Sequence, residues 1–201
     1  MMALRRKDVE ALKKQRRLDG LGDAGQGPYA GFAPRALALF IDSVIWIPIN
    51  IAFHSLFNGK TNSLALLSYL LLIVLSLAHP VIFHAQWGQT LGKMVSRIKV
   101  TRLDGKPIGY GKAALRSSVD ILLMALYVSG VVSIYATWEG PEWSTLSYME
   151  LNAALRERNA SVLYLTLSLI WTGSELVVLL LNEKKRALHD FIAGTVVIHK
   201  L

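Results

Sequence analysis

Four long apolar runs constrain this sequence more than any other feature. Each is long enough to cross the hydrocarbon core of a bilayer, which takes roughly 20 helical residues. With 53% of its 201 residues apolar and a mean hydropathy of +0.39, the chain is too hydrophobic for an ordinary soluble domain. The predicted spans are Ala36–Phe57, Leu64–Phe83, Ala113–Trp138 and Ser161–Leu181. The sequence therefore predicts an all-α membrane protein built as a four-transmembrane-helix bundle.

The third run is longer than one span requires. Tyr127, Tyr135, Trp138 and Trp143 near its far end are typical of an aromatic belt at the membrane interface. We therefore expect this helix to tilt or to continue along the interface.

The distribution of Lys and Arg predicts the orientation of these spans. Seven of them precede Arg35, six lie between Gln86 and Lys112, and four follow Leu181. The other two connections are poor in basic residues, and the second of them contains four glutamates. Because basic loops stay in the cytoplasm, both termini and the middle loop are expected there. The location predicted is the cell (cytoplasmic) membrane, and the first apolar run is interpreted as a retained span rather than a signal peptide.

The first 28 residues differ from the remainder in composition. We interpret residues 1–28 as a basic cytoplasmic segment with a glycine-rich linker, and residues 29–201 as the membrane domain. The basic segment either lies on anionic lipid, where each cation adds about 1 kcal/mol, or is a charged tail without a partner. The net charge of +8 is assigned to topology and lipid rather than to nucleic acid. No cofactor is predicted, and a homo-oligomer is expected because four helices seldom enclose a pathway alone.

The middle loop carries the pattern of a strand. Residues 97–101 alternate polar and apolar side chains, and Asp104-Gly105 favours a tight hairpin turn. Thr195–His199 has strand-like composition as well. We predict a small cytoplasmic β-hairpin between helices two and three, joined by a C-terminal strand.

Charged residues inside the predicted spans are few and therefore informative, since each costs on the order of 3 kcal/mol at the bilayer centre. Asp42, Asp120 and Glu175 are all expected roughly 9 to 10 Å inside the cytoplasmic boundary, in one layer. Arg35 shares a helix face with Asp42, and Arg116 is four residues from Asp120, so each arginine can neutralise a carboxylate.

Two interpretations of this layer remain open. In the first, the ion pairs only fix the register of the helices. In the second, the third carboxylate leaves excess negative charge, so that one group holds a proton or binds a cation, as in a cation/proton exchanger. The leading functional prediction is a small-ion transporter, and the alternative is a membrane scaffold or accessory subunit that binds a partner or anionic lipid. An enzyme is not expected, because no nucleophile with a matched base and no metal-ligand cluster is evident.

Three segments carry a resemblance to a known family. The runs 29–42, 88–93 and 186–195 are similar to those of the RDD family of bacterial and archaeal membrane proteins, in the same order. The family is named for one arginine and two aspartates. The resemblance implies that Arg35 and Asp42 are the first two, and that Asp190 is the third, with Asp120 as the other candidate. It also implies a suspected role in transport, with sodium–proton exchange associated with some members.

The resemblance adds structural expectations for two motifs. Gly88 and Gly92 are interpreted as flexible points after helix two, and Lys93 as a contact to lipid phosphate. The His189-Asp190 pair is expected to pack beside this motif, with Asp190 accepting hydrogen bonds from loop amides or pairing with Lys93 or Arg97. We expect these roles to be structural rather than catalytic.

Overall fold

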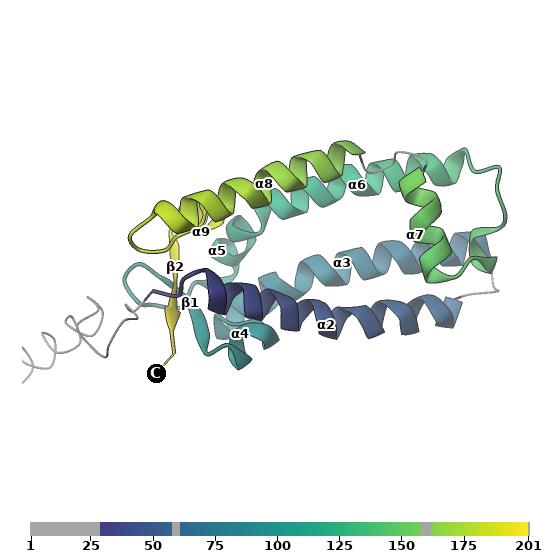
Figure 1. Ribbon diagram of the computed structural model, residues 1–201. Coiled ribbons are helices and arrows are strands. Elements are labelled where there is room, and N and C mark those ends of the chain that lie inside the picture. Colours follow the sequence, from purple (N-terminus) through teal and green to yellow (C-terminus); the bar gives the residue numbers. More distant parts are fainter. Residues whose placement is uncertain (1–28, 58–60, 158–161, 201) are drawn as a thin grey trace, which may run out of the picture.

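Two antiparallel helical hairpins form the body of the protein. In the computed structural model, which describes residues 29–57, 61–157 and 162–200, four helices are long and apolar enough to cross a membrane. Helices α2 and α3 form one hairpin, and α6 and α8 form the other (Figure 1). These helices are α2 (Phe32–Phe57), α3 (Asn62–Trp87), α6 (Ser118–Ala136) and α8 (Val162–Leu181). The four-span prediction is therefore confirmed for this part of the chain, whereas the basic segment before residue 29 lies outside it.

The outward faces of the spans are apolar, as a lipid-facing surface requires. Leu39, Leu122 and Leu169, on three different helices, are 69%, 69% and 73% exposed. Side chains of this kind are stable in contact with lipid and costly in water. The chain is therefore an integral membrane protein whose helices contact the bilayer.

The third span differs from the single long helix predicted for residues 113–138. It is divided at Ser117 into α5 (Gly109–Arg116) and α6. Ser117 has φ −95° and ψ 4°, which departs from helical geometry and changes the direction of the chain. Arg116 consequently lies in a short helix outside the span, and Asp120 lies in the first turn of α6.

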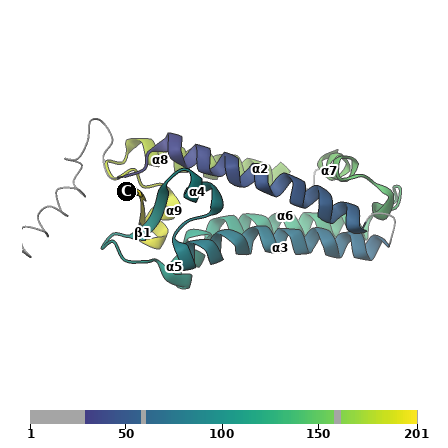
Figure 2. The ribbon, with the colours of Figure 1, turned by 90° about the horizontal axis from the view of Figure 1, so that it is seen from below.

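A small layer of short elements closes one end of the bundle. Figure 2 shows α4, α5, α9 and β1 gathered there, with α7 at the opposite end. The first described residues and the C-terminal strand lie at the same end, so the described termini are on one side (Figure 1). The remaining elements are α4 (Leu91–Val95), β1 (Ile98–Arg102), η1 (Trp143–Thr145), α7 (Tyr148–Glu157), α9 (Leu188–Ala193) and β2 (Thr195–His199).

The sheet in the described residues has two strands rather than three. Strand β1 pairs antiparallel with β2, with Val100 opposite Val197. The turn at Asp104-Gly105 forms, and the Arg102 amide donates to the Lys106 carbonyl at 2.9 Å. The chain then enters α5 instead of returning along β1, so the expected partner strand of the hairpin is replaced by β2.

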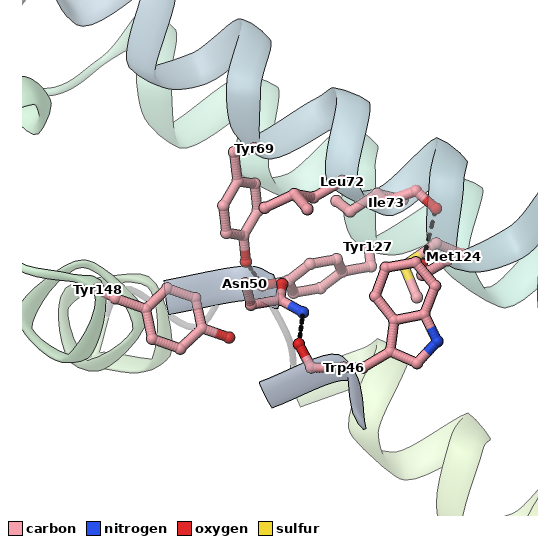
Figure 3. Close-up of a pocket in the computed structure, with 9 residues that line it drawn as sticks. Trp46, Asn50, Tyr69, Leu72, Ile73, Met124, Tyr127 and Tyr148 are labelled. Carbon is pink, nitrogen blue, oxygen red and sulfur yellow. Dashed lines mark hydrogen bonds between the residues drawn. The ribbon is translucent and has the colours of Figure 1, made fainter. Parts of the chain in front are cut away.

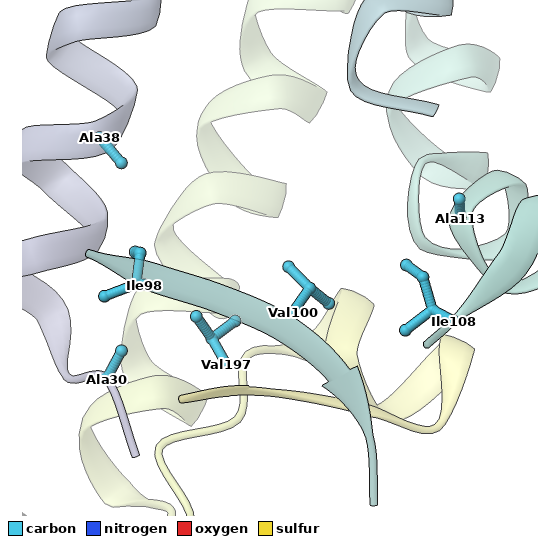
Figure 4. Packing of buried hydrophobic residues seen from close by; sticks show 7 residues of the cluster. All are labelled: Ala30, Ala38, Ile98, Val100, Ile108, Ala113 and Val197. Atoms are coloured by element: carbon cyan, nitrogen blue, oxygen red, sulfur yellow. The ribbon is translucent and has the colours of Figure 1, made fainter. Parts of the chain in front are cut away.

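A compact apolar cluster anchors the sheet to the helices. Its members come from the start of α2, both strands, and the beginning of α5 (Figure 4). They are Ala30, Ala38, Ile98, Val100, Ile108, Ala113 and Val197, all at most 5% exposed. This packing fixes the sheet against the membrane helices and so positions the polar groups beside it.

Candidate functional site

Asp190 is the centre of a buried polar cluster at the sheet end of the bundle. It lies on α9 with no exposed surface. Arg35 donates from Nη1 to its Oδ2 at 2.7 Å, and Arg116 donates to its Oδ1. The Thr195 hydroxyl and the Ala187 amide donate to the same carboxylate at 3.0 and 3.1 Å. We refer to Arg35, Arg116, His189, Asp190 and Thr195 as the arginine–aspartate cluster.

The cluster keeps Asp190 ionised. Burial alone would raise the pKa of this carboxyl, but the positive charges beside it, that of Arg116 first, outweigh burial and hold the pKa well below its usual range. Arg35 also donates from Nε to the Ala30 carbonyl at 3.0 Å and from Nη2 to the Lys185 carbonyl at 2.5 Å. The carboxylate and its arginines therefore join the beginning of α2, the end of α5, α9 and β2.

His189 connects this cluster to a membrane carboxylate. Arg116 Nη2 lies 2.5 Å from His189 Nε2, and His189 Nδ1 is bonded to Glu175 Oε1 on α8. Since a guanidinium only donates, Nε2 must accept, which places the imidazole proton on Nδ1, directed at Glu175. Burial and then Arg116 lower the pKa of His189, so the ring is neutral near pH 7. The result is a chain of donors from Arg116 through His189 to Glu175.

Asp42 does not belong to this cluster and instead accepts hydrogen bonds at the N-terminus of α4. Its Oδ2 accepts from the Thr90 hydroxyl at 2.6 Å, and its Oδ1 accepts from the Gly92 amide at 2.7 Å. These are free donor groups at a helix start, so a carboxylate stabilises them. A Cβ on Gly92 would lie 1.9 Å from the Ala38 carbonyl oxygen. Glycine is therefore required for α4 to approach α2 closely enough for these bonds.

A large cavity lies between the two helical hairpins. We call it the central cavity; its volume is about 1040 Å³, and it is lined by residues of α2, α3, α6 and α8 together with α4, α5, α7 and α9. The three predicted carboxylates Asp42, Asp120 and Glu175 all line it. Arg35, Arg116 and Lys93 line it too.

The charges in the central cavity differ in how well they are paired. Asp120 accepts one hydrogen bond, from Trp171 Nε1 at 3.2 Å, and makes no ion pair within the described residues. Burial and then the charge of Arg116 lower the pKa of Lys93 to about 8, which makes it the cation most easily neutralised there. His84 is 4% exposed, and neither ring nitrogen has a partner among the described residues.

The comparisons with known proteins decide the family. The family model described as RDD family matches residues 29–194. The chain belongs to the RDD family. No curated protein and no solved structure matches it. The matched region begins just before α2 and extends through α9, so it contains the arginine–aspartate cluster up to Asp190 and the central cavity.

The structure of this RDD protein corrects the predicted ion pairs. Arg35 bonds to Asp190 rather than Asp42, and Arg116 bonds to Asp190 rather than Asp120. Both pairs were predicted from spacing within one helix, whereas the arginines contact a residue more than 70 positions away. The backbone amide that donates to Asp190 is that of Ala187, at the start of α9 itself, and not one from the 88–93 loop.

The motif residues depart from several expectations, since Lys93 is half-buried at the central cavity rather than placed as a contact to lipid phosphate. Gly88 ends α3 with φ 70°, a conformation that glycine adopts readily, and its carbonyl accepts from the Val100 amide. Lys93 lines the central cavity and makes no bond to Asp190 in the described part of the chain. Arg97, the other predicted partner, likewise makes no ion pair among the described residues.

Several residues of the site were not predicted from the sequence. Thr195 was interpreted only as a strand residue, although its hydroxyl donates to Asp190. Thr90 precedes α4 and accepts from the Lys93 amide at 3.4 Å, and a threonine just before a short helix is a recognisable N-cap signal. The contact of Trp171 with Asp120 joins two helices and has no signal in the sequence.

Proposed function

We propose that this RDD protein is a small-ion transporter of the cation/proton exchange type, with no enzymatic activity, that works through the central cavity. The observation that supports it best is that Asp42, Asp120 and Glu175, from three different membrane helices, line one space. Carboxylates in a membrane interior are costly, and they are typical of ion and proton pathways.

The charges that line the cavity are balanced when the histidines are neutral. The carboxylates are Asp42, Asp120 and Glu175, and the cations are Arg35, Lys93 and Arg116. Because burial and the charge of Arg116 lower the pKa of Lys93 to about 8, Lys93 is the cation that loses its proton most easily. That loss would leave one excess negative charge, which a proton or a monovalent cation would neutralise.

Asp120 and Glu175 are the proposed exchange sites. Asp42 and Asp190 each receive at least two strong donors, which stabilise the ionised form. Asp120 has one neutral donor. Glu175 accepts from the backbone amide of His189 at 3.3 Å and from its ring Nδ1, and this ring is itself a group that can change its protonation. A carboxylate with few donors is the one that can take up and release a proton at moderate cost.

The orientation and surroundings are part of the same proposal. The sheet end, where both described termini lie, is proposed to face the cytoplasm of a cell membrane, because the basic loops gather there. The basic residues at this end would contact anionic lipid, and the cavity between hairpins would be completed by a second copy of the chain.

The decisive experiment uses purified protein in sealed liposomes with a pH-sensitive dye inside. Pulses of sodium, lithium and potassium should change the internal pH for at least one cation in the wild type. Asp120→Asn should abolish that change, while Asp104→Asn, a matched change in an exposed turn, should leave it intact. If correctly folded wild-type protein moves no protons with any cation, the transporter proposal is wrong.

A second candidate is a scaffold or accessory subunit. It is favoured by the fact that Asp42 and Asp190 hold short elements of the sheet end in place. A protein that only presents this end to a partner would need those contacts and no ion pathway. Loss of partner or lipid binding in variants of the sheet end, together with an inactive wild type in liposomes, would support this alternative.

A further inference from the structure

A second, smaller cavity adjoins the central cavity toward the end of the bundle that carries α7. Its volume is about 220 Å³. Four of its lining residues, Trp46, Asn50, Ser76 and Tyr148, line the central cavity as well, so the two cavities share a wall. No charged side chain lines the smaller cavity.

Aromatic rings from four different helices surround this smaller cavity. Trp46 comes from α2, Tyr69 from α3, Tyr127 from α6 and Tyr148 from α7. Figure 3 shows these rings arranged around the side chain of Asn50. We call these four rings and Asn50 the aromatic cage.

The rings are held in place by contacts of their own. The hydroxyls of Tyr69 and Tyr127 lie 2.7 Å apart and satisfy each other. The centroid of the Tyr148 ring lies 5.8 Å from that of His54, and that of Trp46 lies 5.6 Å from that of His79. A cage formed before the ligand arrives loses little entropy on binding.

Asn50 supplies a polar atom to this space. Its side-chain nitrogen donates to the Trp46 carbonyl at 2.8 Å, whereas its Oδ1 has no partner among the described residues. An amide oxygen among aromatic rings presents partial negative charge without a full ionic charge. Such a surface attracts a cation and repels an anion.

We infer that the aromatic cage binds a small alkylammonium cation. A ring face attracts an ammonium group, and aromatic cages recognise quaternary ammonium ligands. A bare metal ion would need several oxygen ligands to replace its hydration shell, and the cage offers few. An alkylated ammonium spreads its charge over methyl groups that suit an apolar wall. Drug-sized ligands occupy roughly 300–1,000 Å³, so a cavity of about 220 Å³ fits a smaller ion such as tetramethylammonium or choline.

The inference names a class of cation for the proposed transporter and rests on that function only for the transport step. The carboxylates of the adjoining cavity lie on the side toward which the bound cation would move. Binding itself does not depend on transport. The two proposals can therefore fail separately.

The test is isothermal titration calorimetry of the purified protein in detergent, with tetramethylammonium chloride and choline chloride as probes. Both probes should bind saturably, whereas sodium chloride and 3,3-dimethylbutanol, the neutral isostere of choline, should not. Trp46→Leu should weaken binding on the order of tenfold, equivalent to about 1.4 kcal/mol. Tyr69→Phe keeps the ring face and should bind within about threefold of the wild type.

Matched controls separate the cage from general effects on the fold. Trp87→Leu removes a tryptophan from the other end of α3 and should leave binding unchanged. Tyr148→Leu, on a different helix, provides a second cage variant if Trp46→Leu unfolds. No binding to folded wild type, equal binding of the isostere, or equal losses in Trp46→Leu and Trp87→Leu would overturn the inference. Sodium-driven proton movement without alkylammonium binding would overturn it while leaving the transporter proposal intact.

Discussion

Asp190 and Asp120 lie in opposite surroundings although both are acids in a membrane protein. Asp190 accepts bonds from two arginines, a hydroxyl and an amide, and has no exposed surface. Asp120 accepts one bond from an indole and faces a cavity of about 1040 Å³. The first carboxylate is fixed in one charge state, whereas the second has room and few donors.

The difference shows that two acids of one short sequence can be bound in very different ways. The arginine–aspartate cluster joins segments that are far apart in the chain, so its carboxylate must stay ionised. Asp120 makes no ion pair among the described residues, so fewer contacts depend on its charge. Three expected outcomes test this division.

The largest effect is expected from Asp190→Asn. This change leaves Arg35 and Arg116 buried beside each other without a counter-charge, which should lower the free energy of unfolding by about 3–5 kcal/mol. The measurement is denaturant-induced unfolding of the purified protein in mixed micelles, followed by circular dichroism.

Asp120→Asn is the matched comparison for that result. It removes no ion pair from the described residues and should cost less than about 1 kcal/mol. Asp104→Asn, in an exposed pair with Arg102, should cost a similarly small amount. Equal losses for Asp190→Asn and Asp120→Asn would show that the two acids are not divided in this way.

A smaller effect is expected from Gly92→Ala. The new methyl group would meet the Ala38 carbonyl, so α4 must move away from α2 and weaken its bonds to Asp42. The expected loss in the free energy of unfolding is about 1–3 kcal/mol. Thermal melting monitored by intrinsic fluorescence would measure it.

Gly111→Ala is the control for the glycine result. Gly111 lies in α5, and nothing lies within 4 Å of the position its Cβ would take. The substitution should therefore stabilise the protein by about 0.5–1 kcal/mol through helix propensity. A loss of stability as large as that of Gly92→Ala would show that the close approach of α4 and α2 is not the cause.

The positions of the spans and of the two strands were predictable because their signals are local, whereas the hairpin partner expected for β1 did not form. Apolar length indicates a helix such as α3, and alternation indicates strands such as β1. The partners of Arg35 and Arg116 were not predictable from spacing, because both arginines reach Asp190 only after α9 packs against α5 and α2. The break at Ser117 was missed for a related reason, since α5 leaves the direction of α6 to meet α9.

The smallest effect concerns the protonation of His189 and distinguishes two states of its bond to Glu175. Burial and Arg116 lower the pKa of His189 below the usual value of about 6.5, so on acidification the unfolded chain binds a proton before the folded one does. This contribution to stability is complete above about pH 6.5 and decreases by at most about 1.4 kcal/mol per pH unit below it. His189→Asn lacks the contribution, so the difference in the free energy of unfolding between wild type and variant should shrink from pH 7 to pH 5.

A difference that instead grows on acidification would mean that His189 is protonated and ion-paired with Glu175. In that case the chain of donors from Arg116 could not exist, because a protonated ring has no nitrogen left to accept.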